Sequence, residues 1–369
     1  MTQETLQETY MKRCIDLARS GLGNTAPNPL VGSVIVYNNK IIGEGFHEVF
    51  GGPHAEVNAI NSVEDKSLLR NSVLYVNLEP CSHTGKTPPC ADTIINHGIP
   101  EVVIGTTDPN PLVSGNGIKK LKNAGVFVTV KVLEKQCLDL NKRFITYHLC
   151  QRPYIILKWA QTCDGFIDVN RDGTENLQPT WISNDISRML VHKWRSEEQA
   201  ILIGTHTAAM DNPRLNVREW EGRSPIRMII DRNLTLKHNL HIFDNTSPTI
   251  IFNAVKEHEE GQTKYVRLDF NDHFLKNLLD YLYDTGVQSV FVEGGRMLLE
   301  SLIKENLWDE ARVFEGLKKF GSGIPAPVMP DECKPEKYCI REDVLKIYKN
   351  GGTNLLSAVN ILADGKKLK

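Results

Sequence analysis

Short strand-type segments alternate with helix-type segments along most of the chain, and this order constrains the fold more than any other feature. Such alternation is typical of layered α/β domains, in which helices cover the faces of a sheet. In the first half, apolar periodicity and turn residues predict helices over 6–18, 54–61, 118–124 and 134–150, and a further helix that begins near residue 90. They predict strands over 31–37, 41–46, 72–78, 102–106 and 126–130.

The pattern restarts after Arg152-Pro153, because Pro153 discourages a helix from continuing up to it. Beyond this point we expect strands over 154–160, 200–204, 226–231, 249–253 and 289–293, helices over 186–195, 274–285 and from 297, and a loop over 321–335. A chain of 369 residues is long enough for two domains at roughly 150 residues each. We therefore predict one domain over 1–150 and a second over 151–369.

Charge and composition narrow the function classes. The 43 Lys and Arg side chains nearly balance 45 Asp and Glu, which argues against a nucleic-acid partner but allows a small phosphorylated substrate. The amino-terminal segment has no apolar signal region, and no run of eighteen apolar residues predicts a membrane span. We expect a cytoplasmic protein whose eight cysteines are reduced.

One group of residues predicts a catalytic zinc site. His54, Cys81 and Cys90 can fill three positions of a tetrahedral zinc ion and leave the fourth open for water. Glu56 follows His54 by two residues, so its carboxylate can exchange a proton with that water without binding the metal. We expect both cysteines at or near helix starts, where the helix dipole favours the thiolate.

The spacing of these residues is close to a known signature. A His-x-Glu motif followed by Pro-Cys pairs is typical of zinc nucleobase deaminases. Eight residues separate Cys81 from Cys90 instead of two, and this insert places His83 and Lys86 where they can contact an anionic substrate. The other six cysteines have no ligand spacing, and we interpret them as small buried apolar residues.

Longer motifs resemble a known family. The first half resembles the deaminase half of the bifunctional riboflavin-biosynthesis deaminase-reductases in residues 26–32 (APNPLVG), 43–47 (GEGFH), 51–57 (GGPHAEV), 78–90 (LEPCSHTGKTPPC) and 108–111 (DPNP). The resemblance implies a cytidine-deaminase-like three-layer fold. It also implies contacts to the pyrimidine or its ribose phosphate from Asn28, His47, His83, Lys86 and Asn110.

The second half lacks the G-x-G-x-x-G fingerprint of a Rossmann cofactor site. It resembles instead the reductase half of the same family, which has a dihydrofolate-reductase-like fold, in residues 158–165 (KWAQTCDG), 181–183, 192–195, 200–204, 211–215 (DNPRL), 225–227 and 293–295 (EGG). The resemblance implies that NADPH is bound by Ala160, Trp181, Thr207, Asp211, Gly294 and Gly295. It implies that the substrate is bound by Lys158, Arg195, Leu215, Arg218 and Glu293, and the two arginines are suited to its phosphate.

The chain departs from the family pattern at three places in this half. Thr162 stands where the family usually has Ser, Arg232 replaces a common serine, and residues 313–316 (VFEG) replace a short Ala-Pro segment. These departures bear on the cofactor contacts and on the register of the last strands.

The resemblance implies two consecutive reactions. The first half would remove the 2-amino group of 2,5-diamino-6-ribosylamino-4(3H)-pyrimidinone 5′-phosphate, and the second half would use NADPH to reduce the ribosyl chain to ribityl. We expect a homo-oligomer. Two alternatives remain: a zinc deaminase that acts on another nucleotide or on RNA or DNA, and a zinc-stabilised binding protein, each with a second domain that does not catalyse.

Overall fold

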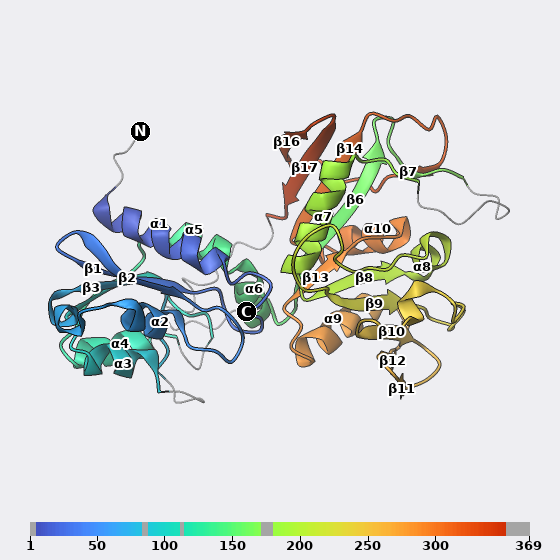
Figure 1. Ribbon diagram of the computed structural model, residues 1–369. Helices are drawn as coiled ribbons and strands as arrows, with labels where there is room; N and C mark the ends of the chain where they lie inside the picture. Colours follow the sequence, from blue (N-terminus) through green and yellow to red (C-terminus); the bar gives the residue numbers. More distant parts are fainter. Residues whose placement is uncertain (1–4, 83–87, 111–113, 171–179, 352–369) are drawn as a thin grey trace. The chain divides into compact units, whose positions relative to one another are not determined.

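The computed structural model describes residues 5–82, 88–110, 114–170 and 180–351. The chain divides between residues 151 and 152 into two compact parts, which we name unit 1 and unit 2 (Figure 1). The end of the expected second domain, 352–369, lies outside the described residues. No helix within the described ranges is both long and apolar enough to cross a bilayer.

Unit 1 is built on one mixed sheet. Its strands are β1 (Gly32–Tyr37), β2 (Lys40–Phe46), β3 (Val73–Leu78), β4 (Glu101–Thr106) and β5 (Phe127–Thr129), and its helices are α1 (Leu6–Arg19), α2 (Ala55–Ser62), α3 (Cys90–Asn96), α4 (Asn116–Asn123), α5 (Glu134–Leu140), α6 (Lys142–Cys150) and the 3₁₀ turn η1 (Lys66–Asn71). The strand order is β2-β1-β3-β4-β5, and β1 is antiparallel to both of its neighbours whereas β3, β4 and β5 are parallel.

The two faces of this sheet bury different side chains, as the period of two in a strand requires. On one face, Ile35, Leu74 and Val102 pack with apolar residues of α2, α3 and α4. On the other, Val34 and Tyr75 pack with α1 and α5. Figure 1 shows the sheet between these two helix layers. The arrangement confirms the predicted three-layer α/β unit.

The stretch over 134–150 is helical, as predicted, but it divides into two helices. The structure has α5 and α6, which meet at Asn141, where the backbone leaves the helical conformation. The buried Asn141 side chain accepts a hydrogen bond from the Leu30 N–H at 2.8 Å and donates one to the Leu30 carbonyl at 2.9 Å. These two bonds fix the chain before β1, and apolar periodicity carries no signal of them.

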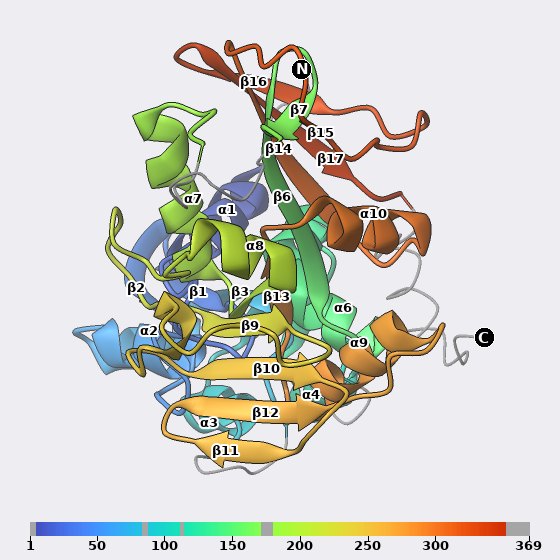
Figure 2. The ribbon, with the colours of Figure 1, turned by 90° about the vertical axis from the view of Figure 1, so that its right-hand side faces the viewer.

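Unit 2 is built on a larger sheet. Its strands are β6 (Tyr154–Thr162), β7 (Phe166–Asp168), β8 (Ala200–Gly204), β9 (Ile226–Ile230), β10 (Thr249–Asn253), β11 (His258–Glu260), β12 (Thr263–Arg267), β13 (Ser289–Val292), β14 (Glu310–Gly316), β15 (Ile324–Pro325), β16 (Glu336–Ile340) and β17 (Asp343–Lys349). Its helices are α7 (Asp185–Glu197), α8 (Thr205–Asp211), α9 (Phe274–Asp284), α10 (Arg296–Lys304) and the 3₁₀ turn η2 (His241–Phe243). The main sheet has the order β11-β12-β10-β9-β8-β13-β6-β14-β17-β16, and β15 pairs with β7 (Figure 2).

The centre of this sheet, from β12 to β14, is parallel and is covered on both faces, as parallel sheets usually are. Helices α9 and α10 bury one face, where Leu157, Leu202 and Val292 lie. Helices α7 and α8 bury the other, where Ile201 and Phe291 lie. The carboxyl ends of β6, β8 and β13 lead into the loops that form the site described below.

Candidate active sites

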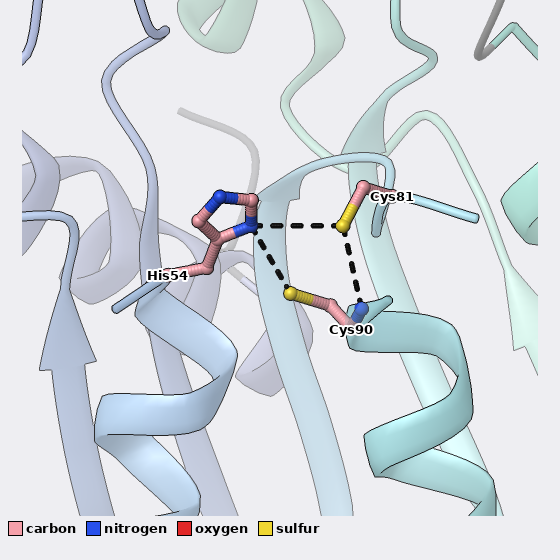
Figure 3. Close-up of side chains that lie close together, drawn as sticks. All are labelled: His54, Cys81 and Cys90. Carbon is pink, nitrogen blue, oxygen red and sulfur yellow. Dashed lines mark hydrogen bonds between the residues drawn. The ribbon is translucent and has the colours of Figure 1, made fainter. Parts of the chain in front are cut away.

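Three side chains of unit 1 form a compact group of metal-ligand type. His54 Nδ1 lies 3.2 Å from Cys90 Sγ and 3.6 Å from Cys81 Sγ (Figure 3). The three ligand atoms lie within 4.8 Å of one another. A tetrahedral zinc ion with Zn–S bonds of about 2.3 Å and Zn–N bonds of about 2.0 Å spans distances of this size. One nitrogen and two sulfurs therefore fit a zinc ion and leave one position open.

The elements around the sheet bring these ligands together. His54 is the N-cap of α2, Cys90 is the first residue of α3, and Cys81 follows the end of β3. Both cysteines lie at or near a helix start, as expected: Cys90 begins α3, and Cys81 lies in the loop after Glu79 and Pro80, beside that same start. The Cys90 backbone N–H donates to the Cys81 sulfur at 3.3 Å, so the helix start favours the thiolate of Cys81.

The surroundings of Cys81 and Cys90 shift the pKa values of the two thiols in opposite directions. A hydrogen bond from the Cys90 side chain, helped by His54, lowers the pKa of Cys81 to about 4 despite burial. The same hydrogen bond, together with burial, raises the pKa of Cys90. Cys81 is therefore the more acidic of the two thiols, and both must lose their protons to bind a metal.

Glu56 is placed beside this group in the first turn of α2 and is only 3% exposed. Burial, with the neighbouring Cys81 thiolate, raises the pKa of Glu56 to about 7. A carboxyl group with such a pKa can both accept and donate a proton near neutral pH. This is the property that a proton carrier next to a metal-bound water needs.

Two of the predicted substrate residues adjoin the same group. His47 Nδ1 lies 2.9 Å from the Pro53 carbonyl, which can only accept, so this nitrogen carries the proton. Its Nε2 therefore accepts from the Asn28 amide at 3.0 Å. Burial lowers the pKa of His47, which favours this neutral form. The His47 ring lies edge-on to the ring of His54, with centroids 5.4 Å apart.

Of the other three predicted substrate residues, the structure describes Asn110. Asn110 follows β4, and its backbone N–H donates to Asp108 Oδ1 at 2.8 Å. His83 and Lys86 lie outside the described residues.

The interpretation of the remaining cysteines as buried is correct for Cys14 and Cys137. It is wrong for Cys150, Cys163 and Cys339, which are exposed, and Cys333 is intermediate. Residue type alone does not distinguish these environments.

Unit 2 contains a cavity of about 1030 Å³ at the carboxyl ends of its parallel strands. All of the predicted cofactor residues line it, namely Ala160, Trp181, Thr207, Asp211, Gly294 and Gly295. Gly295 has a φ of 69°, which favours glycine, and a Cβ at Gly294 would lie only 3.0 Å from Thr207 Cγ2. The volume and the close backbone approach fit a dinucleotide, and α10 begins at this glycine pair.

The wall of this cavity also holds Lys158 and Glu293. The Glu293 carboxylate accepts from Arg195 Nε at 2.6 Å and from Nη2 at 2.8 Å. Burial favours the neutral acid, but the Arg195 charge outweighs it and lowers the pKa of Glu293 to about 2. Burial lowers the pKa of Lys158.

Arg195 contacts Glu293 in the structure, and its expected role at the substrate phosphate stays a prediction. Its fork is bound to Glu293, and its Nη1 donates to the Asn216 carbonyl at 3.1 Å. Three of its five N–H donors are used in these contacts, two of them on the buried carboxylate. Its geometry is that of a group that holds Glu293 in the cavity wall.

Arg218 and Leu215 differ in what they offer to a ligand. The Arg218 side chain is 41% exposed and lies 3.7 Å from Glu219, so it remains accessible to an anion. Leu215 is buried in the core of unit 2 and is not part of the cavity wall. The Arg218 N–H donates to His192 Nδ1 at 3.3 Å, and burial lowers the pKa of His192 to about 4.

The three departures from the family pattern lie in a turn, in the cavity wall and in a strand. The Thr162 hydroxyl donates to Asp164 at 2.5 Å and accepts from the Phe166 N–H at 3.0 Å, so it closes a turn. Arg232 lines the cavity, and its guanidinium lies 5.8 Å from the centroid of the Phe270 ring. Residues 313–316 belong to β14, which pairs in register with β6 and β17.

Sequence reasoning did not predict Phe270 as part of the cavity wall. It stacks on Phe274 at 4.1 Å between ring centroids, in the segment that leads into α9. The pair of aromatic residues four apart at a helix start was the available signal, but it is equally typical of a core face.

Two family models match separate parts of the chain. Residues 4–106 match the cytidine and deoxycytidylate deaminase zinc-binding region, and residues 153–348 match the RibD C-terminal domain. The riboflavin biosynthesis protein RibD of Aquifex aeolicus is 41% identical over 86% of this chain and 89% of its own length. That of Bacillus amyloliquefaciens is 38% identical over 84% of both chains.

Solved structures agree with the sequence relatives. The crystal structure of a diaminohydroxyphosphoribosylaminopyrimidine deaminase/5-amino-6-(5-phosphoribosylamino)uracil reductase from Thermotoga maritima is 38% identical and superposes with a TM-score of 0.84, covering 93% of this chain and 98% of that one. Acinetobacter baumannii RibD has a TM-score of 0.82 at 29% identity, with the same coverage.

Fold and sites together define an enzyme in which a zinc-dependent, cytidine-deaminase-like domain is joined to a dihydrofolate-reductase-like domain that uses NADPH. Both folds and both cofactors were predicted from the sequence and are confirmed. The chain belongs to the RibD family and is a bifunctional deaminase and reductase of riboflavin biosynthesis.

Proposed function

We propose that the substrate is 2,5-diamino-6-ribosylamino-4(3H)-pyrimidinone 5′-phosphate and that the final product is 5-amino-6-ribitylamino-uracil 5′-phosphate. The observation that carries this proposal is the buried Glu56 beside the His54, Cys81 and Cys90 group. The activities named for the Thermotoga maritima protein support the same pair of reactions.

Deamination exchanges an amino group for oxygen: water adds at C2, the C2–N bond breaks, and ammonia leaves. Zinc, when bound by His54 and the two cysteines, lowers the pKa of a water molecule. Glu56 would accept a proton from the attacking water and pass protons to the ring nitrogen and to the departing amine. Asn28 and His47 would orient the pyrimidine, because they share a hydrogen bond beside His54.

Reduction of the ribosyl chain requires a hydride at C1′ and a proton, and NADPH supplies the hydride when it is bound. Ala160, Trp181, Thr207, Asp211 and the Gly294-Gly295 pair would hold the cofactor along the cavity wall. Lys158 would donate a hydrogen bond or a proton to the reacting sugar, since burial weakens its hold on that proton. Arg195 would keep Glu293 in place, and the accessible Arg218 would contact the phosphate.

The test is mass spectrometry of the products with and without NADPH. Without NADPH we expect only the deaminated compound, and with NADPH we expect the ribityl product. Glu56→Gln should lower ammonia release by about 10²–10⁴-fold, because it removes the proton carrier. That variant should still reduce the deaminated compound. An unchanged rate of ammonia release in Glu56→Gln would contradict the proposal.

We also propose a small-molecule substrate with no nucleic-acid partner, in a cytoplasmic enzyme. The formal net charge of −2 supports the first part, and the cysteines without disulfides among the described residues support the second. Salt-dependent RNA binding would contradict the first part. A homo-oligomer stays a prediction, which light scattering of the purified chain tests.

A further inference from the structure

We propose that Glu79 is a positioning residue of the deaminase: it fixes the loop that carries Asn110 to the strand end that carries the zinc ligand Cys81. The inference rests on the proposed function, since it concerns how the pyrimidine is held beside the metal. Glu79 belongs to the motif that contains Cys81, but neither metal binding nor proton transfer uses it.

The Glu79 carboxylate is 4% exposed and accepts hydrogen bonds from four backbone N–H groups. Its Oε2 accepts from Asp108 at 3.3 Å and from Gly115 at 3.0 Å. Its Oε1 accepts from Gly117 at 2.9 Å and from Ile118 at 3.2 Å. A single side chain thereby binds both Asp108, after β4, and the residues at the start of α4.

The Glu79 carboxylate caps the start of α4 in place of a side chain at the N-cap position. The N-cap of α4 is Gly115, which has no side chain to accept from the first helical N–H groups. Glu79 accepts from two of those groups across a sequence separation of 38 and 39 residues. Within the described ranges no cation pairs with Glu79, so amide groups and the helix start stabilise its charge.

The backbones of the two segments also touch. A Cβ on Gly117 would lie 2.0 Å from the Pro80 carbonyl oxygen, so only glycine allows this approach. Pro80 directly precedes Cys81. At the other end of the segment, Asp108 Oδ1 accepts from the Asn110 N–H at 2.8 Å. The contacts therefore run without a break from the metal ligand to the residue expected on the substrate.

Such an arrangement predicts a specific defect when Glu79 is changed. Gln has the same size, but its NH₂ group cannot accept, so two of the four N–H groups would face a donor. The loop with Asn110 would lose its fixed place, whereas His54, Cys81, Cys90 and Glu56 keep their own contacts. Substrate binding should suffer more than the chemical step.

The experiment measures steady-state ammonia release by the full-length, zinc-loaded chain. For Glu79→Gln we expect KM for the pyrimidine nucleotide to rise at least tenfold and kcat to fall less than threefold, with zinc content unchanged. Reduction of the deaminated compound by the same preparation should keep wild-type values. Glu44→Gln is the matched control, because it loses a two-point contact with Arg13 in the same unit and lies outside the site.

A KM within twofold of wild type in Glu79→Gln, or an equal rise in Glu44→Gln, would overturn the inference. If Glu79→Gln does not fold, Asp108→Ala removes only the acceptor for the Asn110 N–H, and its KM must rise for the inference to stand. A wild-type chain that releases no ammonia overturns the proposed function and this inference together. An active wild type with unchanged KM in these variants overturns the inference alone.

Discussion

Glu293 is a buried charge on which the second site depends. Its pKa of about 2 lies below the ordinary value of 4.5, because the charges of Arg195 and Lys158 outweigh the effect of burial. The ionised carboxylate therefore stabilises unit 2 above about pH 4.5, and this contribution is lost as the pH falls toward 2. The shift corresponds to about 3 kcal/mol of free energy of unfolding.

Replacing Glu293 by Gln should remove that pH dependence. We expect the free energy of unfolding of unit 2 at pH 7 to fall by about 3–5 kcal/mol, because Arg195 is left as an unpaired buried charge. Urea unfolding at pH 7 and pH 3 measures this, followed by tryptophan fluorescence, since all five tryptophans belong to unit 2. Glu300→Gln, which loses only the exposed partner of Arg296, should cost less than about 1 kcal/mol. An equal pH dependence in Glu293→Gln and wild type would contradict this account.

At this scale, the sequence predicted residues whose chemistry depends on type and short spacing. The zinc ligands and Glu56 are examples, because a His-x-Glu motif followed by two Pro-Cys pairs is specific to catalytic zinc sites. The partner of Arg195 could not be predicted, since Glu293 is 98 residues away and only the order of β8 and β13 in the sheet brings it near.

At the scale of elements, α2 holds the first site only because β2 allows it to lie very close. Gly43 and Gly45 face this helix: a Cβ on Gly45 would lie 2.4 Å from the Ala59 nitrogen, and one on Gly43 would lie 2.5 Å from Val63 Cγ2. Helix α2 begins directly after His54 and carries Glu56. Gly43 and Gly45 thus determine how close α2, and with it the metal site, lies to the sheet.

Gly45→Ala should push α2 away from the sheet. We expect a loss of about 1–3 kcal/mol in the free energy of unfolding of unit 1, as for overpacked cores, and weaker zinc binding. Competition with a chromophoric chelator measures the zinc affinity. Ile41→Ala on the same strand is the control, because this residue is 39% exposed and makes no close approach to α2: zinc affinity should not change, although some apolar burial is lost. If Gly45→Ala bound zinc with wild-type affinity, the distance of α2 from the sheet would not determine the geometry of the zinc site.

Two physical features explain why sequence patterns did not predict some of the strands: buried charged residues and a position near the edge of the sheet. Strand β14 contains Glu310 and Arg312, which a sequence pattern places in water, yet both are buried. They pair at 2.6 Å, and the Arg312 guanidinium lies 4.5 Å from the centroid of the Trp194 ring. Strands β11, β12, β16 and β17 lie toward the sheet edges, where the apolar signal is weak. Central parallel strands such as β6 and β8 were predicted because both of their faces are largely apolar.

At the scale of the whole molecule, the described residues of each site come from a single unit. The zinc group, Glu56, Asn28, His47 and Asn110 belong to unit 1, and every residue of the cavity wall belongs to unit 2. Each unit also has its own sheet and its own apolar cores. A change at one site should therefore leave the other reaction intact.

A mixing experiment tests this independence. Glu56→Gln should reduce but not deaminate, and Lys158→Met should deaminate but not reduce, because each loses a group of one site only. An equimolar mixture with substrate and NADPH should form the ribityl product after a lag, since the deaminated compound must leave one chain and enter another. The lag should shorten as the protein concentration rises, and liquid chromatography with mass detection follows both compounds. The double variant is the control and should form no product. If the mixture accumulated the deaminated compound without reducing it, although each variant kept its remaining activity, the second reaction would require an intermediate made on the same chain.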